Sequence, residues 1–141
     1  MRIFYTDGSA SPNPGPGGYA VMEGGKPVAL GSEDGETTNI RMEARALAAA
    51  LTLAAGEPCE IRTDSEFWIN VLTKWAPGWK ANGWKKKSRG EIQNLDLVQE
   101  LLELYEASPR AKLTWVKGHD DNENNELADE WANKARKGER I

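Results

Sequence analysis

Short apolar runs separated by clusters of glycine, proline and asparagine predict five strands along this chain. The first run, "RIFYT", is rich in aromatic and β-branched residues and is followed by the breaker-rich segment "DGSASPNPGPGG". Gly24-Gly25 suits a tight hairpin between the second and third runs, so the first three strands are expected to pair antiparallel. The expected strands are residues 2–6, 18–23, 27–31, 59–64 and 111–118.

Apolar residues at helical spacing predict four helices, of which residues 41–56 are the clearest. Alanine favours this helix and Gly56 ends it. Its repeating apolar positions are Met42, Ala46, Ala49, Ala50 and Leu53. The other expected helices are residues 66–75, 95–107 and 125–138. The order β-β-β-α-β-α-α-β-α indicates an α/β fold with a five-stranded mixed sheet, antiparallel in its first three strands and parallel in its last two, flanked by helices.

Length and composition are those of a soluble globular protein. With 141 residues, 39% of them hydrophobic and 28% charged, the chain is expected to form one domain over residues 1–141. Cys59 is the only cysteine, so no intrachain disulfide can form, as suits a reducing compartment. The chain opens on a charged strand with no apolar leader, and no apolar run reaches membrane-spanning length. We therefore expect a cytoplasmic protein that does not bind membranes.

The net charge of −4 argues against a general nucleic-acid binder, but the charges are segregated. Residues 67–90 contain six lysines and arginines and no acid. Residues 119–130 contain six acids and no lysine or arginine. The chain thus combines a basic segment, which also carries tryptophans, with an acidic one.

Four acids are candidates for a shared site. Asp7 and Asp64 follow two strands that are expected to be parallel neighbours, so both side chains should emerge at one edge of the sheet. Glu43 lies near the start of the helix between them, and Asp129 lies in the last helix. Taken singly, each acid also fits an ordinary structural role, as a turn residue after a strand or a solvated helix position.

Clustered carboxylates repel one another and need a counter-charge. Because no lysine or arginine adjoins Asp7 or Asp64, a hard divalent cation is the natural counter-charge, and Mg²⁺ fits best. Two such ions roughly 4 Å apart are a common device for phosphodiester cleavage. The four acids therefore predict a metal site.

Four sequence blocks resemble the signatures of type 1 ribonuclease H, in the order in which that family carries them. They are "TDGSASPNPGPGG", "TTNIRMEA", "TDSEF" and "WVKGHDDNENNELADE", and the resemblance runs from Tyr5 to about residue 134. It implies a ribonuclease H-like fold and a basic protrusion at about residues 75–94, as in the bacterial form of the enzyme. It further implies a metal-dependent endonuclease that cuts the RNA strand of RNA–DNA hybrids and leaves 5′-phosphate and 3′-hydroxyl ends.

The resemblance also implies roles for individual residues. Asp7, Glu43, Asp64 and Asp129 would be catalytic and would bind two Mg²⁺ ions, with Mn²⁺ as a substitute, and the protein would act as a monomer. His119 maps onto the family histidine, which can move protons or help product release, although it could also be an exposed loop histidine without a role.

Polar, basic and aromatic residues are candidates for hybrid binding. Asn13, Thr38, Asn39, Ser65 and Asn94 would contact sugar and phosphate groups in the minor groove, although caps and turns are their ordinary role. In the protrusion, lysines would bind phosphates while tryptophans either contact sugars or pack into the core. The protrusion candidates are Trp75, Trp79, Lys80, Lys85, Lys86 and Lys87.

Two positions depart from the family pattern, and two alternatives stay open. Ile40 stands where the family often has a second asparagine, and Glu66 where a glutamine is common, which affects substrate selectivity. A binding module without chemistry, and a DNA-acting nuclease of the same fold, are the alternatives. The intact set of acids disfavours the first, and the asparagine-bearing loops and basic protrusion disfavour the second.

Overall fold

A five-stranded mixed sheet forms the centre of the molecule. A computed structural model describes residues 1–85, 91–117 and 123–141. The strands are β1 (Arg2–Ala10), β2 (Gly15–Glu23), β3 (Lys26–Thr37), β4 (Cys59–Thr63) and β5 (Ala111–Trp115). Their spatial order is β3-β2-β1-β4-β5, in which β3, β2 and β1 pair antiparallel and β1, β4 and β5 pair parallel. The predicted fold class is confirmed.

Strand β1 runs further than the sequence pattern predicts. We expected a strand that ends before Asp7, but β1 continues to Ala10 through "DGSA". Asp7 pairs with Ala20 and Ser9 with Gly18, so the ladder with β2 overrides the local preference of Asp-Gly for a turn. Strand β4, in contrast, stops at Thr63, opposite Thr6. Asp7 is therefore paired with a residue of β2 on one side and with no residue of β4 on the other side.

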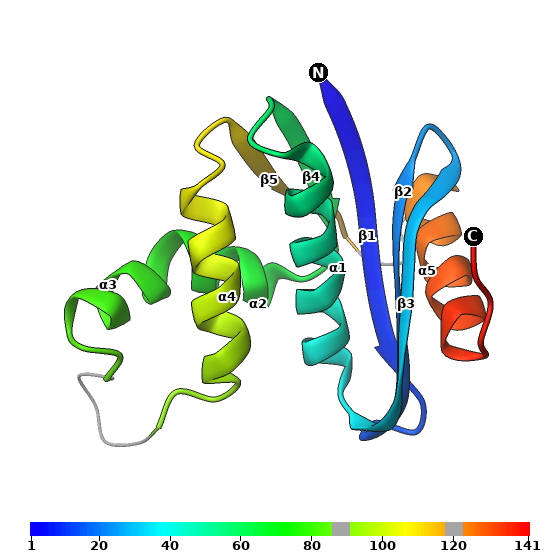
Figure 1. Cartoon of the computed structure of the whole chain (residues 1–141), viewed down its shortest axis with the longest axis horizontal. Helices are drawn as coiled ribbons and strands as arrows, with labels where there is room; N and C mark the ends of the chain where they lie inside the picture. Colours follow the sequence, from blue (N-terminus) through cyan, green and yellow to red (C-terminus); the bar gives the residue numbers. More distant parts are fainter. Residues whose placement is uncertain (86–90, 118–122) are drawn as a thin grey trace.

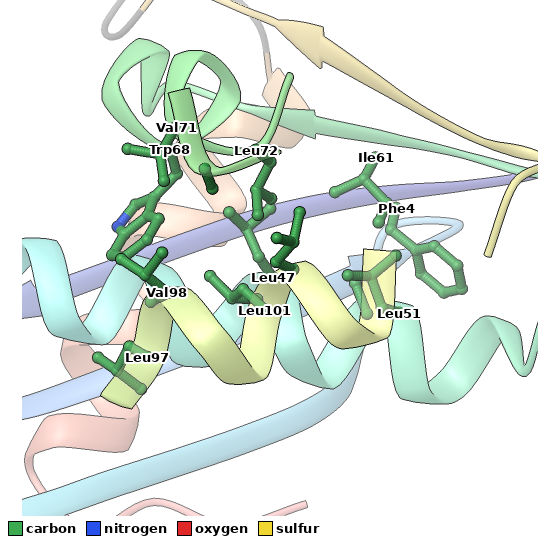
Figure 2. Close-up of a cluster of buried hydrophobic side chains, with 14 of the residues drawn as sticks. Phe4, Leu47, Leu51, Ile61, Trp68, Val71, Leu72, Leu97, Val98 and Leu101 are labelled. Carbon is green, nitrogen blue, oxygen red and sulfur yellow. The ribbon is translucent and has the colours of Figure 1, made fainter. Parts of the chain in front are cut away.

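Helix α1 (Asn39–Ala54) packs on β1 and β2 on one face of the sheet, and helix α4 (Leu95–Glu106) packs beside α1 (Figure 1). Both helices bury an apolar stripe. The main core is formed by these stripes, by the sheet and by the segment that follows β4. Figure 2 shows the interdigitation of these side chains. The labelled members are Phe4, Leu47, Leu51, Ile61, Trp68, Val71, Leu72, Leu97, Val98 and Leu101.

Helix α5 (Glu123–Arg136) covers the other face, where it packs on β1, β2 and β3. A smaller cluster with Tyr5, Met22 and Ala128 lies beneath it. The approach is close because β2 has a glycine there: a Cβ on Gly18 would lie 2.3 Å from the backbone nitrogen of Arg136.

The chain after β4 is helical for longer than predicted. Helix α2 (Glu66–Asn70) continues into a π-helical turn, η1 (Val71–Trp75), and then into α3 (Ala76–Ala81). The predicted helix ends at residue 75, but the helical segment continues through Pro77, because proline is compatible with the first turn of a helix and Pro77 lies in the first turn of α3. Within the described residues, no helix is both long and apolar enough to cross a membrane.

Candidate active site

Three of the predicted acids meet where β4 ends beside the middle of β1. Thr6 and Thr63 are paired in the parallel ladder, and Asp7 and Asp64 are the residues that follow them. Ligand oxygens of Asp7, Glu43 and Asp64 all lie within 4.8 Å of one another. The pairing register therefore places the two aspartates side by side, as the sequence predicted.

Glu43 reaches this edge because α1 packs very closely on β1. A Cβ added to Gly8 would lie 2.3 Å from the carbonyl carbon of Met42 and 2.4 Å from the nitrogen of Glu43, which is closer than any side chain could stand. Thr38 caps the start of α1 by accepting a hydrogen bond from the backbone of Arg41 at 3.1 Å. The close contact between α1 and Gly8 thus places Glu43 next to Asp7.

Asp129 joins the cluster from the opposite face. It lies on α5, and its side chain is close enough to that of Asp7 to help raise the pKa of Asp7. Asp129 is exposed, whereas Asp7 is only 7% exposed. The structure therefore brings all four predicted acids together, with Asp7 at the buried centre.

Burial and mutual repulsion make the cluster difficult to ionise. Burial, followed by the charge of Asp64 and the contact and charge of Asp129, raises the pKa of Asp7 to about 9. Burial and the charge of Asp64 raise the pKa of Glu43 to about 7, against a hydrogen bond from Ser65 that favours its ionised form. Within the described chain, no lysine or arginine forms an ion pair with Asp7 or Glu43.

These features fit a divalent cation of the hard type. Carboxylate oxygens are the ligands that Mg²⁺ prefers in proteins, and a bound cation would reverse the raised pKa values by favouring the charged carboxylates. Asp7, Glu43 and Asp64 are the residues that could hold it, with Asp129 at their side.

A pocket of about 520 Å³ lies between the start of α1 and the start of α4, and three of the predicted binding residues line it. Asn13, Thr38 and Asn94 contribute polar groups to its wall. Ile40, one of the two departures from the family pattern, is another lining residue. The pocket thus gathers polar groups that come from three separate parts of the sequence.

Several of these polar residues also hold the backbone around the pocket. Asn13 accepts a hydrogen bond from the backbone nitrogen of Asn39 at 3.2 Å, and the side chain of Asn39 accepts one from Ala10 at 2.7 Å. Ser65 caps α2 by accepting from Trp68 at 3.3 Å, in addition to its bond to Glu43. The capping role and the predicted binding role are compatible, because each cap also fixes a side chain at the site.

An exposed aromatic row follows Asp64 along α2, η1 and α3. The rings of Phe67 and Trp75 lie 6.3 Å apart and those of Trp75 and Trp79 lie 6.4 Å apart. Phe67 is 42% exposed and Trp75 is 43% exposed, whereas Trp79 and Trp84 pack against the main core. Trp75 therefore presents a free aromatic surface, while Trp79 and Trp84 attach the protrusion to the body of the protein.

The predicted lysines differ in their surroundings. Lys80 forms an ion pair with Glu106 of α4 at 2.9 Å, and Lys85 is exposed. Lys86, Lys87 and His119 lie outside the described residues.

The sequence interpretation missed three residues at this site. The helical pattern of residues 66–75 does not single out Phe67, which is exposed although its neighbour Trp68 is fully buried. Gln93 lines the pocket, and Arg41 bonds to Asn94, which also lines it. Neither could be found from local pattern, because the partners come from distant parts of the chain.

Comparison with known proteins gives a consistent result. The sequence model of the family "RNase H" matches residues 1–137. A ribonuclease H of Granulibacter bethesdensis is 44% identical over 139 residues, which cover 94% of this chain and 90% of the relative. A ribonuclease H of Erythrobacter litoralis is 43% identical over 138 residues, covering 94% of this chain and 93% of the relative. Among solved structures, LC9-RNase H1, a type 1 RNase H with the type 2 active-site motif, superposes with a TM-score of 0.77 at 28% identity, over 99% of this chain and 74% of the other.

Proposed function

The chain belongs to the ribonuclease H family and is an endoribonuclease, and we propose that it uses divalent cations at its acidic cluster to hydrolyse the RNA strand of RNA–DNA hybrids. The observation that carries the proposal is the convergence of Asp7, Glu43 and Asp64 within 4.8 Å at the edge of the sheet. The products would carry 5′-phosphate and 3′-hydroxyl ends.

The four acids would hold two Mg²⁺ ions, for which Mn²⁺ could substitute. When bound, two such ions activate a water molecule and stabilise the oxygen that leaves the phosphorus. Asp7 is central because it contacts both Asp129 and the pair Glu43 and Asp64. His119 would assist by moving a proton.

The pocket and the aromatic row would hold the two strands of the hybrid. Neutral donors such as Asn13, Thr38 and Asn94 suit sugar hydroxyls and phosphate oxygens, and hybrids are recognised mainly by shape and by such contacts. The exposed rings of Phe67 and Trp75 offer flat apolar surfaces to the deoxyriboses of the other strand. The exposed lysines of the protrusion would add phosphate contacts.

We further propose that the protein works as a monomer in the cytoplasm. Its single cysteine, Cys59, is buried and cannot form an intrachain disulfide, which suits a reducing compartment.

Cleavage assays with matched substrates test the proposal. Purified protein is incubated with labelled RNA–DNA hybrid, duplex RNA and duplex DNA, with and without Mg²⁺. We expect cleavage of the hybrid alone, only with Mg²⁺, and its loss in Asp7→Asn. Asp34→Asn, which removes the same charge from an exposed position of β3, is the control and should cleave normally. Binding of the hybrid without any cleavage would instead identify an inactive binding module, and cleavage of duplex DNA would identify a DNA-acting nuclease.

A further inference from the structure

Arg41 joins the start of α1 to the start of α4 through three hydrogen bonds. Its guanidinium donates to both carboxylate oxygens of Asp96, at 3.2 and 2.9 Å, and to the amide oxygen of Asn94 at 3.2 Å. Asp96 in turn has its pKa lowered by the bond from Arg41, so the pair is fully charged at neutral pH. The two-pronged contact fixes the plane of the guanidinium and so the place of its bond to Asn94.

Asn94 has an unusual conformation for a residue that begins a helix. It precedes α4 with a φ of 56° in the left-handed region, and its side chain forms no capping hydrogen bond. Asparagine at such a position usually accepts a bond from the helix backbone. Here its amide oxygen is used by Arg41 instead, while the residue lines the pocket beside Thr38 and Asn13.

The bond from Arg41 decides which end of the amide faces the pocket. An asparagine amide has an acceptor oxygen on one side and two N–H donors on the other. Because the oxygen is held by Arg41, the donors are directed away from it, and phosphate and sugar oxygens are acceptors that require donors. With the amide reversed, the oxygen of Asn94 would face those acceptors and repel them.

We propose that Asp96 and Arg41 are positioning residues that hold the amide of Asn94 with its N–H donors toward an oxygen of the nucleic-acid backbone in the pocket. This inference rests on the proposed function. Asp96 itself would touch no substrate: it acts only through Arg41, and Arg41 only through Asn94.

The sign of the effect separates positioning from electrostatics. Asp96 is an exposed negative charge next to the binding site of a polyanion, and on charge alone its removal should tighten binding. Positioning predicts the reverse, because the loss of one oriented hydrogen bond weakens binding by about three- to tenfold.

The experiment compares Asp96→Asn and Asp96→Ala with Glu23→Gln. The control removes the same charge from another two-pronged arginine–carboxylate pair, Arg2–Glu23, in which Arg2 and Glu23 lie at the amino end of β1 and the end of β2. For the Asp96 variants we expect KM for the hybrid to rise about three- to tenfold while kcat at saturating hybrid stays unchanged. Glu23→Gln should change neither. Because Asp96 is 66% exposed, both variants are expected to fold, and thermal melts check this.

A double variant makes the path explicit. Asn94→Ala should raise KM by a similar factor, and adding Asp96→Ala to it should cause no further rise, because the two residues act in one chain. An unchanged or lower KM in the Asp96 variants, or additive effects in the double variant, would overturn the inference. If the wild-type protein fails to cleave the hybrid at all, the proposed function fails instead, and hybrid affinity measured in Ca²⁺ still compares the same variants.

Discussion

At the scale of single residues, the most consequential property is the difficulty of ionising Asp7. Its pKa rises from an ordinary 3.8 to about 9, because it is buried among three other acids. The unfolded chain releases this proton in mild acid and the folded chain holds it, so unfolding releases a proton between those two values. The metal-free protein must therefore lose stability as the pH rises through this range.

Replacing Asp7 by asparagine should remove this dependence. In EDTA, the free energy of unfolding of Asp7→Asn near neutral pH is expected to exceed that of the wild type by on the order of a few kcal/mol, so the variant should melt at a higher temperature. The difference in the free energy of unfolding should be larger at about pH 8 than at about pH 5, since the wild type loses stability as the pH rises and the variant has no carboxyl group at this position. Thermal melts across this range check the prediction. Mg²⁺ should stabilise the wild type more than the variant, and a lower melting temperature for the variant at every pH would show that Asp7 supports the fold.

At the scale of secondary-structure elements, the site depends on how closely α1 approaches β1. Gly8 permits that approach, and α1 carries both Glu43 and the capping residue Thr38 into place. Packing and chemistry are therefore joined at one position, next to Asp7 in the chain.

A single methyl group at Gly8 should separate these two elements. Gly8→Ala is expected to destabilise the protein by about 1–3 kcal/mol or more, because the contacting atoms belong to the backbone of α1 and cannot rotate away. The kcat of the folded variant should also fall, by more than the unfolded fraction of the sample explains, since Glu43 moves with the helix. Gly35→Ala is the control: it lies in β3 with open space around it and should change the free energy of unfolding little. Denaturant unfolding and kcat measure the two effects, and normal activity in Gly8→Ala would refute the link.

How much the sequence could predict also depends on the element. The strands, the four main helices and the meeting of Asp7 with Asp64 follow from local patterns and from the rules of parallel sheets. The continuation of β1 through Gly8 could not be predicted, because local turn preference favours a break and only pairing with β2 overrides it. The bond of Arg41 to Asn94 and Asp96 joins residues more than 50 positions apart, and no local pattern contains that information.

At the scale of the whole molecule, the charges are divided between an acidic site and a basic protrusion. The net charge is −4, so attraction for a nucleic acid must come from the protrusion. The protrusion is attached to the rest of the protein by Trp79 and Trp84, which pack on the core, and by the ion pair of Lys80 with Glu106. Lys85, which is exposed, and the two lysines that follow it in the sequence are the remaining candidates for phosphate contacts.

Replacing Lys85, Lys86 and Lys87 by alanine should weaken hybrid binding in a salt-dependent way. Each phosphate contact that is lost lowers the magnitude of the negative slope of log K against log salt by about 0.9, so the loss of three contacts would reduce that magnitude by nearly three units. KM should rise steeply at moderate salt while kcat at saturating hybrid stays near wild type. Hybrid affinity in Ca²⁺ at several salt concentrations measures the slope. The control replaces Lys26, Lys112 and Lys137, which removes the same charge elsewhere, and an equal change in slope for both triple variants would refute a specific role for the protrusion.

The central position of β1 in the sheet determines when Asp7 is exposed as the fold opens. Tyr5 and Thr6 are bonded to β2 on one side and β4 on the other, directly before Asp7 in the chain. Amide hydrogens in such a doubly paired strand are expected to exchange with solvent only when the whole fold opens, whereas a short peripheral helix such as α3 is expected to open locally. Asp7 is thus carried by the part of the chain that is last to come apart, and its carboxylate neighbours from α1, β4 and α5 can gather around it only once the sheet is complete. The complete cluster of four acids therefore exists only while β1, β4, α1 and α5 are all in place.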